Sequence, residues 1–269
     1  MTGQGGIDRM KSQLTRQQKE EFVENGFLHI PSAVPLNMVH AALRAINHSI
    51  GEVGKTGADP TRYRENSHCH ELRHVPVLTD VFNRTAVRDL TEDLLGPDNM
   101  QPVEEVQIAP RFPLAPGVEA SPIEGHLDAV GTGTNGAPTG SYLRNFTVIA
   151  VVYLVDVPAP YSGNFTVWPG SHIESRDFFR RVGHEVLTQG DPDIEDLTGE
   201  PAMLTGRAGD AFLCHHLIQH TGGPNLSPHV RHAVISRIKH RNVDELDLGG
   251  FTDMWREWEG ITDLTVAYT

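Results

Sequence analysis

A change of residue pattern near Val103 constrains the fold of this chain more than any other feature. Before this point apolar residues recur at helical spacing, whereas after it short apolar segments are bounded by Pro, Gly and Asn, as strands are. An order of helices first and strands later is typical of a β-sandwich flanked by helices. We therefore predict a mainly β protein with flanking α-helices, in the form of a jelly roll.

Individual elements can be placed within this pattern. A capping box at Thr15 and Gln18 opens a helix that Gly26 ends, and "FLHI" follows as a short strand. A second helix starts at Pro35 and has Gly51 at its C-cap. Two further helices are expected over residues 84–95 and 255–259, and strands over 103–109, 147–155, 164–168, 210–214 and 231–239.

Length and composition limit the class of protein. The 269 residues suit one domain, in which we expect a flexible tail at 1–13, a mostly helical part at 14–100 and the jelly roll at 101–240. A net charge of −13 argues against nucleic acid and anionic membranes as partners. The two cysteines cannot form a disulfide framework, and neither a signal peptide nor a run of 18 apolar residues is present. These features predict a cytoplasmic protein.

Three residues have the spacing of a metal site. His126 and Asp128 are two apart, so in an extended chain both side chains point to the same face. His220 would complete a two-histidine, one-carboxylate face with open positions opposite, as in non-haem Fe(II) oxygenases. His216 competes with His220, because strand alternation puts both on one face, whereas His215 points to the other. Without further support, His126 and Asp128 could also be surface residues in a turn.

Five segments in order resemble the phytanoyl-CoA dioxygenase family of Fe(II)- and 2-oxoglutarate-dependent oxygenases, over about 220 residues. They are "LTRQQKEEFVENGFLHIPSAVP", "VQIAP", "GHLD", "GNFTVWPGSH" and "GDAFLCHHLIQHTGGPN". The "PGSH" segment and the eleven-residue interval from His220 to Arg231 are the most specific. The resemblance implies a double-stranded β-helix, with iron held by His126, Asp128 and His220.

The resemblance also implies a site for the cosubstrate. Arg231 would hold the far carboxylate of 2-oxoglutarate bidentately, with Arg237 as the alternative on the same face. Gln107 stands where the family places a polar group in the cosubstrate pocket. The family often has a serine two residues past the distal histidine, but this chain has Gly222, so another group must replace that hydroxyl or the contact is lost.

These residues predict a dioxygenase that uses Fe(II), 2-oxoglutarate and O2 to oxidise a C–H bond of a small metabolite, by hydroxylation, desaturation, ring closure or epimerisation. The acidic charge tilts the substrate toward an amine-bearing molecule, and the oligomeric state cannot be deduced. The alternative is a metal-binding cupin-type protein that is non-catalytic or independent of 2-oxoglutarate, which would not require Arg231. A halogenase would need Ala or Gly in place of Asp128.

Long segments between the predicted strands are candidate substrate walls. Residues 129–144 and 173–206 are expected to form lids or walls, and residues 60–75 would face the substrate from another side. The His- and Arg-rich stretch at 62–74 lacks the second pair of ligands that a zinc site needs. His172 of "PGSH" is expected to anchor a loop and not to bind metal.

Overall fold

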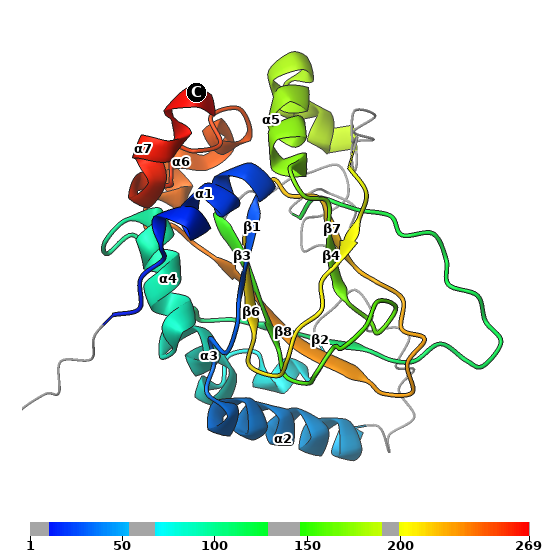
Figure 1. The fold of residues 1–269 in the computed structure, drawn as a ribbon. Helices are drawn as coiled ribbons and strands as arrows, with labels where there is room; N and C mark the ends of the chain where they lie inside the picture. The colour runs from blue at the N-terminus through cyan, green and yellow to red at the C-terminus, as the bar shows by residue number, and fades with distance from the viewer. Residues whose placement is uncertain (1–10, 54–67, 129–145, 190–198, 269) are drawn as a thin grey trace, which may run out of the picture.

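The computed structural model describes residues 11–53, 68–128, 146–189 and 199–268. The predicted lid at 129–144 and the first part of the 60–75 segment lie outside these ranges. The described residues form two antiparallel sheets (Figure 1). The larger sheet has the strand order β1 (Phe27–Ile30), β6 (Ala211–His215), β3 (Val148–Tyr153), β8 (Arg231–Ile238) and β2 (Gln107–Arg111). The smaller has the order β5 (Ala202–Met203), β4 (Phe165–Val167) and β7 (His220–Gly222).

Helices surround these sheets. The longer ones are α1 (Arg16–Asn25), α2 (Leu36–Val53), α3 (Pro76–Asn83), α4 (Ala86–Leu95) and α5 (Ser171–Val182). Short helical turns are η3 (His70–Leu72), η4 (His184–Gln189), α6 (Val243–Leu246), η5 (Asp247–Phe251), η6 (Glu259–Ile261), α7 (Thr262–Thr265) and η7 (Val266–Tyr268). The two packed sheets with flanking helices confirm the predicted fold class. Within the described ranges, no helix has the length and apolar character needed to cross a membrane.

The predicted helix ends are partly correct. The capping box at Thr15 and Gln18 is present, and Gly26 ends α1 in the left-handed conformation with φ 77°. Gly51 does not end α2, which continues to Val53. Residues 255–259 do not form the predicted amphipathic helix, because the chain there turns so that Trp255 and Trp258 both enter the core. A segment this short has little helical stability of its own, so side-chain packing decides its conformation.

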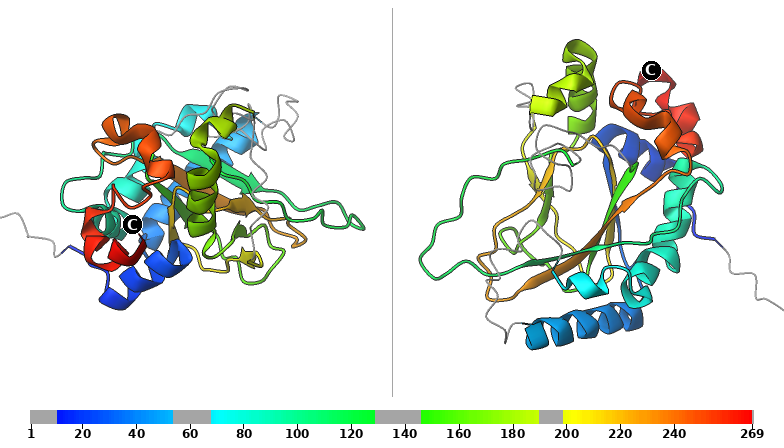
Figure 2. Two further views of the ribbon diagram at one scale, coloured as in Figure 1. Left: turned by 90° about the horizontal axis from the view of Figure 1, so that it is seen from above. Right: turned by 180° about the vertical axis from the view of Figure 1, so that it is seen from behind.

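Both faces of the larger sheet are covered, as the two further views in Figure 2 show. Along β3, alternate residues from Val148 pack against the core formed with α1–α4, whereas those from Ile149 face the smaller sheet. This explains why all six residues of β3 are buried and apolar or aromatic, a pattern that usually marks a strand covered on both sides. The face toward the smaller sheet is called the inner face below.

Tyr153 fastens the two sheets together on the inner face. Its hydroxyl donates to the carbonyl of Leu204 at 2.9 Å and accepts from the backbone N–H of Phe165 at 2.8 Å. Burial raises the pKa of Tyr153 to about 12, so the phenol stays protonated and keeps its donor role.

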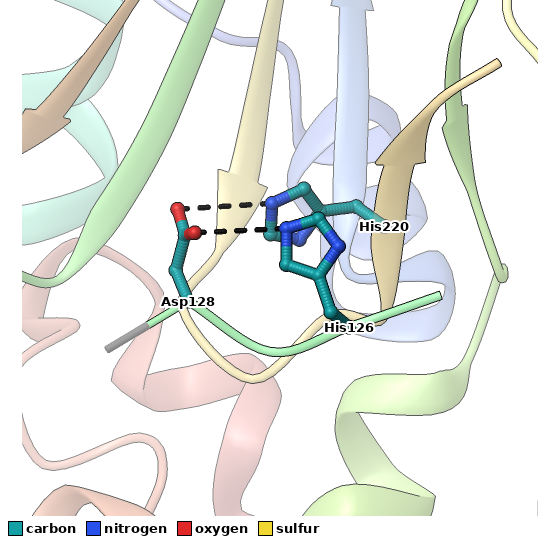
Figure 3. A group of neighbouring side chains, drawn as sticks. All are labelled: His126, Asp128 and His220. Atoms are coloured by element: carbon teal, nitrogen blue, oxygen red, sulfur yellow. Dashed lines mark ion pairs between the residues drawn. The ribbon is translucent and has the colours of Figure 1, made fainter. Parts of the chain in front are cut away.

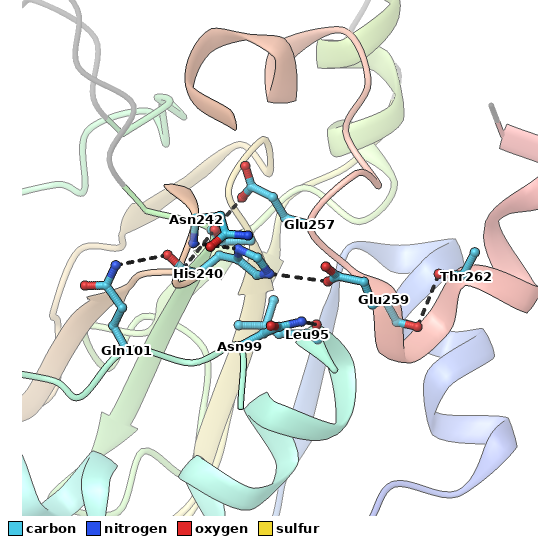
Figure 4. A network of polar contacts seen from close by, with 9 residues as sticks. Leu95, Asn99, Gln101, His240, Asn242, Glu257, Glu259 and Thr262 are labelled. Atoms are coloured by element: carbon cyan, nitrogen blue, oxygen red, sulfur yellow. Dashed lines mark hydrogen bonds and ion pairs between the residues drawn. The ribbon is translucent and has the colours of Figure 1, made fainter. Parts of the chain in front are cut away.

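The C-terminal segment returns to the end of the larger sheet through a partly buried polar network (Figure 4). His240 Nε2 lies 3.4 Å from a carboxylate oxygen of Glu259, and His240 Nδ1 accepts from the backbone N–H of Asn242. The hydroxyl of Thr147, beside β3, donates to Glu257. These contacts hold the segment that carries Trp255 and Trp258 against α1 and β6.

His172 anchors the start of helix α5, whereas the sequence analysis expected it to anchor a loop. The side chain is fully buried, its Nε2 lies 3.1 Å from the carbonyl oxygen of Val23, and its ring lies against Gly26. Added to Gly26, a Cβ atom would come 2.8 Å from His172 Cγ, so the glycine serves both the left-handed cap and this contact. His172 therefore joins α5 to the end of α1 and takes no part in the candidate metal site.

His172 makes the fold sensitive to acid. Burial lowers the pKa of His172 to about 4, so between roughly pH 6.5 and 4 the unfolded chain binds a proton there that the folded protein does not. As the pH falls through this window, we expect the free energy of unfolding to decrease by up to about 3 kcal/mol from this group alone. Urea unfolding of the wild type and His172→Asn at pH 7 and at about pH 5 measures the difference. An equal loss of stability in both proteins would contradict this assignment.

Candidate metal centre

His126 and His220 are joined by their backbones. They form an antiparallel bridge in which the N–H of His126 donates to the carbonyl of His220 at 3.0 Å and the N–H of His220 donates in return at 3.2 Å. Residues directly opposite each other in such a pair have side chains on the same face. Asp128, two residues past His126, points to that face as well, and Figure 3 shows the three side chains converging.

The three side chains offer ligand atoms at short mutual distances. One ligand atom from each of His126, Asp128 and His220 can be chosen so that all lie within 4.8 Å of one another. Asp128 Oδ1 is 3.8 Å from His126 Nε2, and Asp128 Oδ2 is 3.7 Å from His220 Nε2. Two nitrogens and one oxygen on a single face match the donor set of mononuclear non-haem iron sites. The spacing predicted from sequence is therefore realised in three dimensions.

Gly125 allows His126 to reach this position. A Cβ atom at residue 125 would lie 2.9 Å from Trp168 Cζ3, closer than real side chains permit. Trp168 is itself held beside β7, because its backbone N–H donates to the carbonyl of Gln219. The glycine before His126 thus lets the chain pass over the Trp168 ring and pair with His220.

Both imidazoles are prepared to bind a cation. His220 Nδ1 lies 3.1 Å from the carbonyl of Ile218, so Nδ1 carries the proton and Nε2 presents its lone pair toward Asp128. Burial, with the neighbouring His220, lowers the pKa of His126 to about 4. His126 is therefore neutral near pH 7, the state in which a histidine can coordinate metal.

Asp128 is a buried carboxylate, and among the described residues only one of its two oxygens accepts a hydrogen bond. Burial, the largest single effect, would raise the pKa of Asp128. The charge and hydrogen bond of Arg237, together with the two histidines, outweigh burial and keep the pKa well below the usual range. Arg237 Nε donates to Oδ2 at 2.8 Å. Within the described part of the chain, Oδ1 is buried and accepts no hydrogen bond, which is costly unless a cation binds there. The residues present thus fit a divalent metal.

Arg237 also binds Gln107, since Nη1 donates to Gln107 Oε1 at 3.1 Å. Because Arg237 fixes one oxygen of Asp128, replacing it by methionine should lower the affinity for Ni(II) roughly 10- to 100-fold. Removal of the positive charge acts the other way, but we expect the loss of orientation to dominate. Calorimetric titration measures the affinity, with exposed Arg84→Met as the control. Tighter metal binding by Arg237→Met would show that Arg237 repels the cation more than it orients Asp128.

Arg231 lies on the inner face at the start of β8, whereas Arg237 lies near the end of this strand. Its side chain is buried, its Nε donates to the carbonyl of Gly163 at 2.6 Å, and its Nη1 donates to that of Ala109 at 2.7 Å. Among the described residues its bonds go to neutral carbonyls, so its charge is available to an anion. Gln107 lies on the same face of β2, with its amide oxygen occupied by Arg237.

His216 lies apart from the metal candidates. Strand β6 ends at His215, and a turn precedes β7, so strand alternation does not relate His216 to His220. The ring of His216 stacks on His215, and its Nε2 contacts the carbonyl of Gly250 in the C-terminal segment. The alternation argument that put His216 and His220 on one face was wrong, because the strand does not continue from His215 to His220. Arg111, which the sequence analysis did not weigh, lies on the inner face four residues after Gln107.

Comparisons with known proteins agree with this geometry. The profile of the phytanoyl-CoA dioxygenase (PhyH) family matches residues 22–233. No curated protein sequence matches the chain. Since the family match covers most of the chain, the protein belongs to the phytanoyl-CoA dioxygenase family, whose members are Fe(II)- and 2-oxoglutarate-dependent oxygenases.

Solved structures share the fold at low sequence identity. The nogalamycin-biosynthesis carbocyclase SnoK, described as non-heme and alpha-ketoglutarate-dependent, is 19% identical over 84% of each chain, with a TM-score of 0.55. HygX from Streptomyces hygroscopicus, with nickel and 2-oxoglutarate bound, is 17% identical over 85% of this chain and 88% of its own, with a TM-score of 0.55. The epimerase SnoN, in complex with Fe3+, alpha-ketoglutarate and nogalamycin RO, is 17% identical over 83% of this chain and 82% of its own, with a TM-score of 0.51. These likenesses confirm the double-stranded β-helix predicted from the sequence.

Proposed function

We propose that this protein oxidises a C–H bond of a small metabolite, using Fe(II), O2 and 2-oxoglutarate, with release of succinate and CO2. The proposal rests mainly on the cluster of His126, Asp128 and His220. In this cluster the buried Oδ1 atom of Asp128 accepts no hydrogen bond from the described residues and could bind a cation. Family membership supplies the class of reaction. Bound iron would couple the decarboxylation of the 2-oxoacid to oxidation of the substrate.

The residues of the chain have separate tasks in this proposal. His126, Asp128 and His220 hold the metal on one side and leave the opposite positions open. Arg237 orients Asp128 and keeps it ionised. Arg231 holds the far carboxylate of 2-oxoglutarate by charge-assisted hydrogen bonds from a rigid, buried side chain.

Gln107 is proposed to support the same site. Its amide oxygen accepts from Arg237, so it helps to fix the residue that orients Asp128. Its position on the inner face of β2 also supports the sequence-based expectation that it borders the cosubstrate. Gln107 could fill both roles, because its side chain lies on the same face as Arg231 and Arg237.

The substrate is a small molecule by analogy with the structural neighbours, of which SnoN has been seen with nogalamycin RO. An amine-bearing substrate stays a prediction that rests on the net charge of −13. A cytoplasmic location also stays a prediction, and the free thiols of Cys69 and Cys214 are consistent with a reducing compartment. We further propose that the whole chain forms one domain.

Anaerobic titration tests the proposal directly. Addition of Fe(II) and then 2-oxoglutarate to the purified protein should produce the weak visible charge-transfer band of a chelated 2-oxoacid. Addition of 2-oxoglutarate without metal is the control. Tight metal binding with no band, and no binding of 2-oxoglutarate by calorimetry, would contradict the proposed function and favour a metal-binding cupin-type protein. A substrate screen by mass spectrometry would follow a positive result.

A further inference from the structure

The end of β2 places a second arginine beside Arg231. In the antiparallel pairing of β2 with β8, Arg111 stands directly opposite Arg231. Directly opposed residues carry their side chains on the same face, so both arginines point inward with Gln107 and Ala109. Arg111 is half-buried, whereas Arg231 is buried.

The guanidinium of Arg111 lies over Gly222. A Cβ atom built on Gly222 would come 2.7 Å from Arg111 Cζ, and closer still to its Nε and Nη2 atoms. Since Gly222 is two residues past His220 in β7, that Cβ atom would point to the same face as the proposed metal ligand. Arg111 therefore occupies the space on the ligand side of β7 that any other residue at 222 would fill.

Gly163 leaves room for the Cβ atoms of both Arg111 and Arg231. A Cβ atom at Gly163 would lie 2.9 Å from Arg111 Cβ and 3.2 Å from Arg231 Cβ. The backbone of Gly163, at φ 74°, also accepts the hydrogen bond from Arg231 Nε. Two glycines from different segments thus make room for two neighbouring guanidinium groups.

The electrostatics of this pair favour an anion. Two like charges on directly opposed strand residues are unfavourable. Burial is the main cause that lowers the pKa of Arg231 to about 10. The nearby Tyr153 raises this pKa, whereas the charge of Arg111 lowers it further. An anion that reaches from the metal to both guanidinium groups would relieve this repulsion, and 2-oxoglutarate carries a carboxylate at each end.

We propose that Arg111 is a second cationic anchor for the far carboxylate of 2-oxoglutarate, and that Gly222 is the residue that makes room for it. The inference rests on the proposed function, because it assigns a residue to the cosubstrate of that reaction. A guanidinium then replaces the hydroxyl group that the sequence analysis found missing at position 222.

A pair of 2-oxoacids tests the anchor. 2-Oxoglutarate and 2-oxovalerate share the group that chelates metal, but only the first has a far carboxylate. With Ni(II)-loaded protein and calorimetry, Arg111→Ala should bind 2-oxoglutarate roughly ten- to a hundredfold more weakly than the wild type, as loss of a charged hydrogen bond predicts. Its affinity for 2-oxovalerate should stay within about twofold. Exposed Arg84→Ala is the control for loss of a positive charge.

Substitutions at Gly222 provide a second, independent test. Gly222→Ala leaves Arg111 in the sequence but displaces its guanidinium, so it should weaken 2-oxoglutarate binding much as Arg111→Ala does. In the Arg111→Ala background, Gly222→Ala should have little further effect, because the group it displaces is gone. Arg111→Ala combined with Gly222→Ser should recover part of the lost affinity by supplying a hydroxyl in the vacated space.

The outcomes separate this inference from the proposed function. A wild type that binds no 2-oxoglutarate contradicts both. Normal binding of 2-oxoglutarate by a folded Arg111→Ala protein overturns the anchor alone. So does equal weakening of 2-oxoglutarate and 2-oxovalerate binding, because Arg111 would then act at the metal. Thermal unfolding of each variant shows whether it is folded, and additive effects of Arg111→Ala and Gly222→Ala would also refute the pairing.

Discussion

Replacing Asp128 by alanine is expected to reduce iron-dependent turnover to background while the protein stays folded. Asp128 supplies the only negative charge among the three proposed ligands, and its unsatisfied oxygen is the strongest sign that a cation binds there. Two neutral imidazoles alone would hold Fe(II) weakly. The fold should survive because Arg237 is partly exposed, with 31% of its side-chain surface accessible, and keeps its bond to Gln107. Calorimetric titration with Ni(II) and succinate formation measure the two effects.

The same loss is expected for His126→Ala and His220→Ala, since each removes one of the remaining donors. His216→Ala is the matched control, because this buried histidine lies four residues from His220 but contacts the carbonyl of Gly250. It should cost stability without changing the stoichiometry of metal binding. If His216→Ala abolished metal binding and His220→Ala did not, the assignment of the distal ligand would be wrong.

Replacing Arg231 by alanine should weaken 2-oxoglutarate binding by about 2–5 kcal/mol, the usual effect of removing one partner of a buried charged pair. This corresponds to a loss of affinity of roughly thirtyfold to several thousandfold. Metal binding should persist, because Arg231 contacts Gly163 and Ala109 and not the ligands. Calorimetric titration of Ni(II)-loaded protein with 2-oxoglutarate gives the change.

Two further variants make this result interpretable. Arg231→Lys keeps the charge but loses the planar fork that bonds the carbonyls of Gly163 and Ala109, so it should recover only part of the affinity. Arg237→Met should weaken metal binding more than it weakens 2-oxoglutarate binding to metal-loaded protein. An unchanged affinity for 2-oxoglutarate in Arg231→Ala would remove Arg231 from the cosubstrate site and make Arg237 the next candidate.

The metal cluster could be predicted from sequence because its geometry follows from local rules. The spacing of His126 and Asp128 already places two side chains on one face of an extended chain. The helix at 16–25 was also local in origin, since both its capping box and its terminal glycine are readable from a few neighbouring residues. The position of His220 needed the family resemblance, because alternation could not distinguish it from His216.

The rest depends on contacts between segments far apart in the chain. Arg237 binds Asp128, 109 residues away, and no local pattern indicates which arginine of β8 does so. Helix α3 was missed because its eight residues follow a polar stretch without a side-chain cap. Arg111 became significant only when the register of β2 with β8 and the bare backbone of Gly222 were known.

The chain between β2 and His126 has both of its ends fixed. At one end Arg111 is paired with β8, and at the other His126 is bonded to His220, whereas most residues of 112–125 between them are exposed and extend away from the sheets in Figure 1. Because the free energy needed to close a loop grows slowly with its length, insertions here should leave the ligand geometry unchanged. Evolution can therefore change the length and the side chains of residues 112–125 without moving the proposed metal ligands. The reaction would be inherited with the metal site, whereas this segment could adapt to different substrates.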